Sequence, residues 1–304
     1  MSLASDLVGD PLARQWSASL DLRFGTRLGQ TVLLQNTHRG PLRLIKALKS
    51  DGDAPSGPGG QSRLDAMIVH PPGGLAAGDS LRLRIDLEEG ARVRSSTPGS
   101  QKWYRGRASA NTHIQVARGA QLEWLPQPSI VYDGAFVDQS LRVDLDADCA
   151  MVGFECLVLG RRSMGERFAK GWLRQSIRIN RAGRPVWQES TDAGADAPLW
   201  GASAGWAGRV VCASVWAIGG YRATWDDAAL VDQWRAALAT SSETDAGRHA
   251  RLLGGTTRMA SGIVLAKILG DEADTVAELA QQLWALARSP VLGASAQAMR
   301  IWAT

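Results

Sequence analysis

The sequence predicts a mainly β protein whose strands stack in successive layers, with two α-helices near the C-terminus. Apolar and polar residues alternate along the first two-thirds of the chain, which is the period-two signature of half-buried strands. Short similar segments also recur at spacings of 29 and 30 residues. Helical periodicity appears only late in the sequence.

Strands are predicted where the alternation is regular. The clearest examples are residues 17–24, 81–87, 113–116 and 141–145. Two irregular stretches interrupt the pattern. Residues 51–61 are dense in Gly, Pro, Ser and Asp and predict an exposed loop, whereas residues 192–208 are rich in Gly and Ala.

A weak internal repeat indicates how the strands are arranged. Three imperfect copies begin at Gly90, Gly119 and Cys149, and each leads into strand-like residues. A period in this range is what stacked β-rungs produce, because each rung covers the apolar face of its neighbour. The sequence therefore predicts a stack of rungs over this part of the chain.

Two helices are predicted after the strands. The first begins at Asp226 or Asp227, because acidic residues stabilise the first turn of a helix. Its apolar face consists of Leu230, Val231, Trp234 and Leu238. The second covers residues 271–288, with acidic residues at its start and Pro290 as a stop signal. Between the helices, residues 259–269 predict a strand.

Length and composition predict a soluble protein with a sizeable core. The chain has 304 residues, of which 45% are hydrophobic, and it is expected to form a single domain over residues 1–304. A strand-rich body is expected over about 16–220 and a helix-containing part over about 221–304. No apolar run approaches the length of a membrane helix, and the N-terminal residues lack the pattern of a secretory signal. Three cysteines without a CxxC pattern favour reduced thiols in a cytoplasmic protein.

The basic balance of charge leaves nucleic-acid binding open as an alternative. The net charge is +4 and the isoelectric point is near 9.2. Only five of the 34 basic residues are lysines, and the arginines are spread along the chain without a basic block. This distribution favours solvated strand faces or polar protein interfaces over a phosphate-binding patch.

A serine hydrolase is a second alternative. Residues 201–205 match the GxSxG pattern of a nucleophile elbow, and Asp226 or Asp227 and then His249 follow in the chain order of that class. The elbow requires a strand before the serine and a helix after it. Here a segment with a proline precedes it and a strand-like run follows, so a loop of small residues is the favoured interpretation.

Residues that could form a tight metal site are scarce. His38, His70, His113 and His249 show none of the spacings typical of metal-binding histidines, and Cys149 and Cys156 fit no zinc pattern. The sequence therefore predicts no tightly bound cofactor. A protein that passes a metal ion onward is expected to bind it weakly, because imidazole or thiolate cages would retain it.

Four segments with distinctive turns lie in a fixed order along the chain. They are residues 69–79 (VHPPGGLAAGD), 97–105 (TPGSQKWYR), 122–128 (LEWLPQP) and 159–166 (LGRRSMGE). In order and spacing they resemble the urease accessory protein UreD family, called UreH in some organisms. The closing residues Arg300, Ile301 and Trp302 are similar to the end of that family's sequences. The resemblance extends over residues 16–304.

The resemblance implies an elongated, β-helix-like body and a role without catalysis. Members of the family act as urease maturation factors, scaffolds that bind the structural subunits of apo-urease together with the accessory protein UreF and the GTPase UreG. Nickel passes through this hetero-oligomeric complex into the urease active site. The implied ligand is thus transient Ni²⁺, and nucleic acid and membrane are not expected partners.

Carboxylates are the residues expected to line such a nickel passage, because oxygen ligands suit a hydrated divalent ion in transit. The candidates are Asp79, Glu123, Glu155, Glu166 and Glu189. Glu155 stands out because residues 151–159 are otherwise apolar, and a buried charge without a partner is rare. Salt bridges to arginines, or a capped turn at Asp79, are the structural alternatives.

Aromatic residues beside turns and at the C-terminus are expected to contact protein partners. Trp103 and Tyr104 follow a Pro-Gly turn and predict an exposed anchor. The closing residues Arg300, Ile301 and Trp302 combine the types that are enriched at interfaces.

Overall fold

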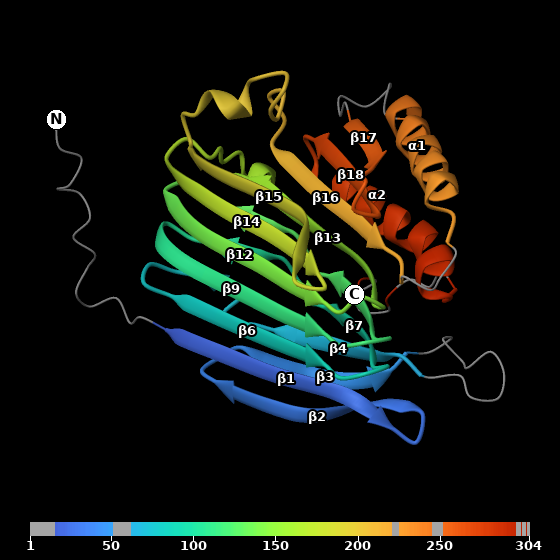
Figure 1. Cartoon of the computed structure of the whole chain (residues 1–304). Coiled ribbons are helices and arrows are strands. Elements are labelled where there is room, and N and C mark those ends of the chain that lie inside the picture. Colours follow the sequence, from blue (N-terminus) through green and yellow to red (C-terminus); the bar gives the residue numbers. More distant parts are fainter. Residues whose placement is uncertain are drawn as a thin grey trace.

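The computed structural model describes residues 16–50, 62–220, 225–244 and 252–295, together with residues 299 and 302. Two curled β-sheets lie face to face, and a pair of helices covers the outer face of the second sheet (Figure 1). This arrangement confirms the prediction of a mainly β fold with stacked sheets and helices near the C-terminus. The residues predicted as a loop at 51–61 lie outside the described residues.

The first sheet forms one face of the stack. Its strand order is β15-β14-β12-β9-β6-β1-β2, and its central neighbours run parallel. The bounds are β1 Ser17–Arg27, β2 Gln30–Arg39, β6 Ser80–Leu87, β9 Gly106–Val116, β12 Ala135–Leu145, β14 Gly171–Arg181 and β15 Arg184–Gly194. The strands predicted from alternation are parts of β1, β6, β9 and β12, so those predictions are confirmed.

The second sheet lies between the first sheet and the helices. Its main strand order is β17-β18-β16-β13-β10-β7-β4-β3, with the short strands β5, β8 and β11 joined beside it. The bounds are β3 Arg43–Lys49, β4 Leu64–Val69, β5 Gly74–Leu75, β7 Arg92–Ser96, β8 Gln101–Trp103, β10 Gln121–Leu125, β11 Ser129–Val131, β13 Ala150–Leu159, β16 Val211–Ile218, β17 Leu253–Arg258 and β18 Ile263–Gly270.

The chain passes alternately through the two sheets, and the length of each rung is close to the spacing of the sequence repeat. In the second sheet Val93, Leu122 and Met151 are direct neighbours, each 29 positions from the next. Gly90 and Gly119, which begin two of the repeat copies, both have positive φ in the turns that enter these strands. The predicted stack of rungs is therefore confirmed, and equivalent residues of successive rungs pair in parallel register.

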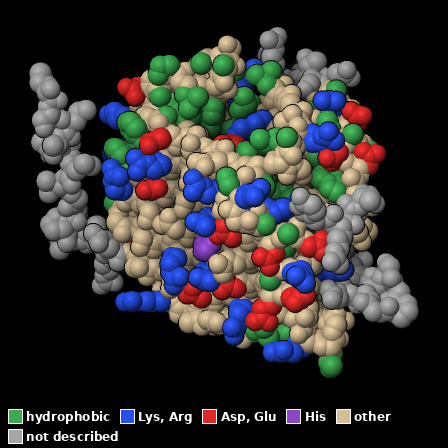
Figure 2. Space-filling model, in the orientation of Figure 1, with side chains coloured by type: hydrophobic (Ala, Val, Ile, Leu, Met, Phe, Trp, Pro, Cys, Tyr) green, Lys and Arg blue, Asp and Glu red, His purple; other side chains and the backbone are tan. Residues whose placement is uncertain are grey.

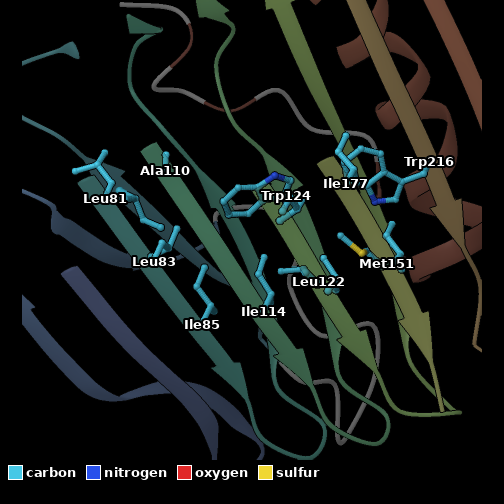
Figure 3. Close-up of a cluster of buried hydrophobic side chains, with 14 of the residues drawn as sticks. Leu81, Leu83, Ile85, Ala110, Ile114, Leu122, Trp124, Met151, Ile177 and Trp216 are labelled. Atoms are coloured by element: carbon cyan, nitrogen blue, oxygen red, sulfur yellow. The ribbon is translucent and has the colours of Figure 1, made fainter. Parts of the chain in front are cut away.

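The main hydrophobic core fills the space between the sheets (Figure 3). Ile85 and Ile114 point inward from the first sheet, and Leu122 and Met151 face them from the second, all fully buried. These positions follow from the alternation in the strands, since every second side chain faces the opposing sheet. The core thus holds the two sheets at a fixed separation around the cavity described below.

A second core lies between the second sheet and the helices. Helix α1 (Asp227–Thr244) buries Leu230, Val231, Trp234 and Leu238, as its apolar stripe predicts. Helix α2 (Ala273–Ala287) packs against β16, β13 and β18. Because both faces of β13 and β16 are covered, every residue of these two strands is buried, and each reads as a nearly continuous apolar run.

Two boundary predictions are wrong. Residues 259–269 do not form one strand, because Gly262 at φ +79 closes a turn between β17 and β18. Pro290 does not stop the helical region either. The chain continues past α2 as a short π-helix, η4 (Arg288–Leu292), and ends at Gly293 in the left-handed conformation.

Candidate functional site

A cavity of about 270 Å³ lies between the two sheets. Its walls come from the inward faces of β6, β9 and β12 on one side and of β4, β7 and β13 on the other. On its outer side the lining includes the loop residues 97–100 and 126–127, among which Pro98 and Gly99 are exposed. On its inner side the lining ends at Glu155, so the cavity leads from the surface to a buried carboxylate.

Glu155 lies on β13 and has no basic partner. Its Oε1 accepts a hydrogen bond from Trp124 Nε1 at 2.8 Å, and its Oε2 accepts one from Gln139 Nε2 at 3.2 Å. Burial raises the pKa of Glu155 to about 7, and although the two hydrogen bonds oppose this rise, the nearby charge of Glu189 adds to it. The salt bridge to an arginine considered for Glu155 is therefore absent among the described residues.

A second, narrow space continues from the other side of Glu155. It measures about 10 Å³, close to the smallest volume that holds a water molecule, and its lining includes Glu189, Cys212, Ser214 and Lys267. Glu189 lies on β15 and accepts a hydrogen bond from the Ser214 hydroxyl at 3.2 Å. Glu155 lines both spaces and Glu189 lines the second, so the two predicted carboxylates face the same narrow space from β13 and β15.

Several polar atoms on the cavity wall lack a hydrogen-bond partner among the described residues. They are both ring nitrogens of His70, Ser95 Oγ, Gln101 Nε2 and Gln139 Oε1. Burial lowers the pKa of His70, although the charge of Asp79 opposes the shift, so the imidazole favours its neutral form. Buried polar groups in globular proteins are almost always satisfied by protein or by water. These atoms are therefore placed to bind ordered water, in a lining that also contains apolar side chains such as Leu81 and Leu83.

Asp79, Glu123 and Glu166 lie outside the linings of both spaces. Asp79 closes the turn before β6, where its Oδ1 accepts the Trp16 amide at 3.0 Å and its Oδ2 accepts the Ala76 amide at 2.8 Å. Glu166 is bound by the Asp133 amide at 2.7 Å and by Arg161 at 3.2 Å. Asp79 therefore caps a turn, and Glu166 forms an ion pair within a loop.

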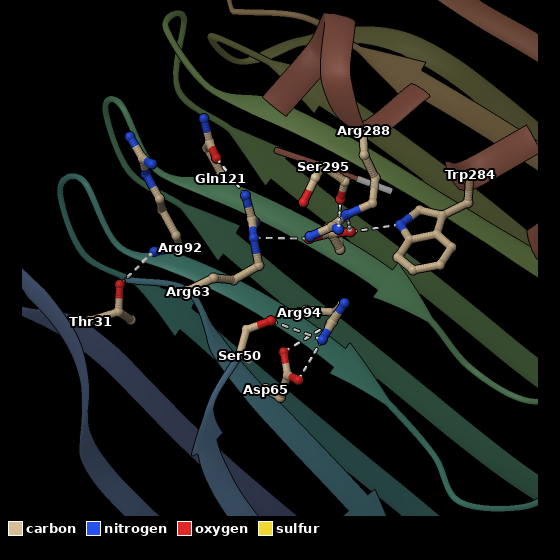
Figure 4. A network of polar contacts seen from close by, with 11 residues as sticks. Thr31, Ser50, Arg63, Asp65, Arg92, Arg94, Gln121, Trp284, Arg288 and Ser295 are labelled. Carbon is tan, nitrogen blue, oxygen red and sulfur yellow. Dashed lines mark hydrogen bonds and ion pairs between the residues drawn. The ribbon is translucent and has the colours of Figure 1, made fainter. Parts of the chain in front are cut away.

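Glu123 is the centre of a buried polar network, and its three partners Arg63, Trp284 and Arg288 are labelled in Figure 4. Its carboxylate lies 3.0 Å from Arg63 Nε and 2.9 Å from Arg288 Nε, and it accepts a hydrogen bond from Trp284 Nε1 at 2.6 Å. All three donors converge on one fully buried carboxylate, so its oxygens are occupied. The network joins α2 and η4 to the second sheet.

The structure overturns the expectation that Trp103 is an exposed anchor. Trp103 is 1% exposed because β8 is held between β5 and β11 and turns this side chain into the main core. Tyr104 is half-buried, and its ring meets Tyr132 edge-on at 5.2 Å between centroids. Arg161 lies over the Tyr132 ring at 5.1 Å.

Trp302 at the C-terminal end contacts the body of the protein. Its Nε1 donates to Ser96 Oγ at 3.1 Å, and its ring lies 5.5 Å from Trp284 and 6.4 Å from Phe154. Ser96 also lines the cavity, so the C-terminal end borders the cavity wall. Arg300 and Ile301, the other predicted anchors, lie outside the described residues.

The nucleophile-elbow pattern lacks the required local structure. Residues 201–205 form turns after a short 3₁₀ helix, η2 (Pro198–Trp200), and the chain then enters β16 rather than a helix. Asp227 forms an ion pair with Arg258 at 2.8 Å, and His249 lies outside the described residues. The loop interpretation of this segment is confirmed.

Basic residues are not segregated into a patch on the face that Figure 2 presents. Figure 2 shows Lys and Arg side chains interspersed with Asp and Glu on the face that it presents. Exposed arginines on the strands pair with acids, as in Arg82 with Asp21 at 2.9 Å and Arg142 with Asp144 at 2.7 Å. This pattern fits solvated strand faces and does not favour a phosphate-binding surface.

In the part of the chain that the structure describes, no group of three or more His, Cys, Asp or Glu residues is placed to hold a metal ion. Neither helix there has the length and apolar character needed to cross a membrane.

Comparison with known proteins identifies the family. The sequence model of the UreD urease accessory protein family matches residues 17–303. The chain belongs to the UreD family. It is 35% identical over 298 residues to the urease accessory protein UreD of Dechloromonas aromatica, covering 95% of each chain. It is also 35% identical over 308 residues to the protein of that name from Azoarcus sp., covering 100% of each chain.

The segments that carried the resemblance to the UreD family gather around the cavity. Residues from 69–79, 97–105 and 122–128 contribute to its lining, although they belong to different rungs. The segment 159–166 ends β13 and forms a 3₁₀ turn, η1 (Arg162–Met164). Three of the four segments thus meet at one place in the fold.

The sequence analysis missed several residues that line these two spaces, above all Lys267 and Gln139. Lys267 carries the same signal as Glu155, since it is the one charged residue in the apolar run of β18, Ile263–Gly270. Gln139 gives no such signal, because an amide on an alternating strand is ordinary. Its role depends on its position opposite Glu155 across the two sheets.

Proposed function

We propose that this chain is a urease maturation factor that acts in the cytoplasm. In this proposal it is a scaffold without catalytic chemistry that binds apo-urease, UreF and the GTPase UreG, and nickel passes through it toward the urease active site. The family and the names of its relatives support the link to urease. The observation that carries the nickel part is the line of two carboxylates, Glu155 and Glu189, along the spaces between the sheets.

The physical argument concerns the cost of moving a dication through a protein. A divalent ion in a low-dielectric interior needs water, fixed negative charge or oxygen ligands along its path. The cavity offers unsatisfied polar atoms for a hydrated ion at its outer part and a carboxyl with a pKa of about 7 at its inner end. A carboxyl with that pKa can release its proton when a cation arrives and take it back when the cation leaves.

The C-terminal part is proposed as the docking region for UreF. It combines the amphipathic helix α2 with Trp302, which contacts Ser96 on the cavity wall. A partner bound there would lie next to the loops at 97–100 and 126–127 that border the outer side of the cavity. Docking and nickel entry would then occur at neighbouring surfaces.

The test replaces each carboxylate of the route with its neutral isostere. In Glu155→Gln and Glu189→Gln, complexes with UreF, UreG and apo-urease should form in normal yield, while the nickel content of the matured urease should fall severalfold. Glu89→Gln, in an exposed turn before β7, is the matched control and should leave nickel content unchanged. Both quantities are measured on one preparation, by size-exclusion chromatography and by elemental analysis.

The outcomes separate transport from structure. Normal nickel content in the double variant Glu155→Gln/Glu189→Gln would refute the passage role while leaving the scaffold role in place. Loss of the complexes before any loss of nickel would assign these residues to folding.

A further inference from the structure

A lysine side chain lies against the carboxylate at the far end of the narrow space. Lys267 Nζ forms an ion pair with Glu189 Oε1 and donates to Ser214 Oγ at 2.7 Å. Ser214 and Lys267 are paired neighbours on β16 and β18 of the second sheet, whereas Glu189 lies on β15 of the first. The ammonium group therefore bridges the two sheets beside the narrow space that Glu155 also lines.

The exposure of the two side chains places this pair at a rim. The Lys267 side chain is 49% exposed and the Glu189 side chain is 22% exposed. Glu155, on the other side of the same space, is buried and only 7% exposed. Solvent thus reaches the pair from outside, and the buried carboxyl lies behind it.

Lys267 stays charged at neutral pH. Burial lowers the pKa of Lys267, but the neighbouring Cys212 and Glu189 raise it by more, so the net shift is upward. The ammonium occupies a carboxylate oxygen and a hydroxyl oxygen, and oxygen atoms of this kind are what a divalent ion in transit would otherwise contact.

We propose that Lys267 is a built-in cation that occupies the metal position at Glu189 and closes this end of the passage to divalent ions until its side chain moves out to solvent. The inference rests on the proposed nickel passage and adds its regulation. An ammonium and a dication cannot share one carboxylate in so small a space, because like charges at contact distance repel. The long, flexible lysine stem and its half-exposed position allow the head group to leave without unfolding the strand.

The competing interpretation is an ordinary ion pair that ties the sheets together. That role predicts a loss of stability when Lys267 is replaced, and no change in metal binding. A built-in cation predicts instead that replacing Lys267 changes metal binding more than stability. Removing the ammonium leaves Glu189 free for a metal ion at a place where the two sheets already hold it.

The experiment titrates Ni²⁺ into the full-length chain, purified with UreF where that is needed for solubility, by isothermal titration calorimetry. Lys267→Met keeps the length of the stem and removes the charge, so its Kd for Ni²⁺ should be roughly tenfold lower than that of the unsubstituted protein, or lower still. Lys267→Arg keeps a cation and should bind as the unsubstituted protein does. Lys49→Met, on the exposed edge strand β3, is the control for losing one positive charge and should also show no change.

A double variant assigns any gain in affinity to the intended carboxylate. In Lys267→Met/Glu189→Gln the tighter binding should disappear. Thermal unfolding of every variant shows that the comparison is made on folded protein. Unchanged Ni²⁺ affinity in folded Lys267→Met would overturn the proposal, as would an equal gain in Lys49→Met.

Different results would refute the role of Lys267 as a gate and the role of the two carboxylates in the nickel passage. If Glu189→Gln lowers the nickel content of urease but Lys267→Met binds Ni²⁺ like the unsubstituted protein, the passage stands and the gate is refuted. If Lys267→Met gains affinity but Glu155→Gln and Glu189→Gln leave urease nickel unchanged, Lys267 masks a cation site that is not part of nickel delivery, and the gate is refuted as well.

Discussion

The carboxylate of Glu123 lies 2.9 Å from Nε of Arg288, although 165 positions separate the two residues in the chain. Glu123 belongs to a rung of the second sheet, and Arg288 begins η4 after helix α2. Arg63, which directly precedes β4, places its Nε 3.0 Å from the same carboxylate. One buried acid therefore pairs with two buried guanidinium groups and attaches the C-terminal part to the sheets.

We predict that Glu123→Ala is strongly destabilising. It would leave Arg63 and Arg288 buried without their carboxylate, and breaking a buried ion pair by removing one partner costs about 3–5 kcal/mol. Urea unfolding followed by tryptophan fluorescence measures the loss. Asp232→Ala, which removes an exposed pair with Arg235 on α1, is the control and should cost less than about 1 kcal/mol. Equal, small effects in both variants would contradict the buried network.

We predict that Glu155 makes the protein less stable as pH rises toward neutrality. The pKa of Glu155 is raised in the folded state from 4.5 to about 7, so folding favours its protonated form. Its contribution is therefore complete below pH 4.5 and is lost as pH rises through about 7. The free energy of unfolding should fall across this window by up to about 3 kcal/mol from this group.

Glu155→Gln isolates that contribution. A neutral amide can accept from Trp124, and the free Oε1 of Gln139 can turn to receive its N–H. The difference in unfolding free energy between the variant and the unsubstituted protein should grow with pH in denaturant titrations at several pH values. A difference that stays constant from acidic to neutral pH would show that Glu155 titrates normally.

For Asp79 we predict a stability effect before any nickel effect. Asp79→Ala removes the acceptor of two part-buried amides, those of Trp16 and Ala76, and each unsatisfied donor costs about 1–3 kcal/mol. Asp79→Asn keeps one side-chain oxygen and should lose less. Thermal unfolding and the yield of soluble protein measure both. A fully stable Asp79→Ala that lowers urease nickel would instead support the passage role predicted for Asp79 from the sequence.

Gly74 in β5 and Gly99 in the loop before β8 should differ in their tolerance of a methyl group. A Cβ on Gly74 would lie 2.6 Å from the Tyr104 ring and 2.8 Å from the Lys102 carbonyl oxygen, so Gly74→Ala should cost about 1–3 kcal/mol as an overpacked site. A Cβ on Gly99 would meet no atom within 4 Å. Gly99→Ala should therefore be neutral in the same thermal-unfolding assay. Equal stability of the two variants would contradict the close packing of β5 against Tyr104.

Local pattern predicted the strands well and the position of their ends less well. The alternation at 81–87 predicted β6, and the repeat predicted that the segments around Val93 and Leu122 stack as rungs. The turn at Gly262 was missed because an apolar run flanking a glycine reads the same whether the chain continues or reverses. Trp103 was misplaced for a related reason, since a short segment beside a turn does not reveal which face is covered.

The sequence by itself determined the approximate period of the rungs, the inward face of the alternating strands, the apolar faces of the helices and the family. These properties arise from neighbours a few residues apart, or from order along the chain. Only the tertiary structure decided what each predicted carboxylate does. Glu123 meets Arg288 across 165 positions, whereas Glu155 meets only neutral donors, because the stacking of the sheets and the docking of α2 set those distances. Two acids of the same type in similar apolar strands thus became a structural ion pair and a carboxyl beside a cavity.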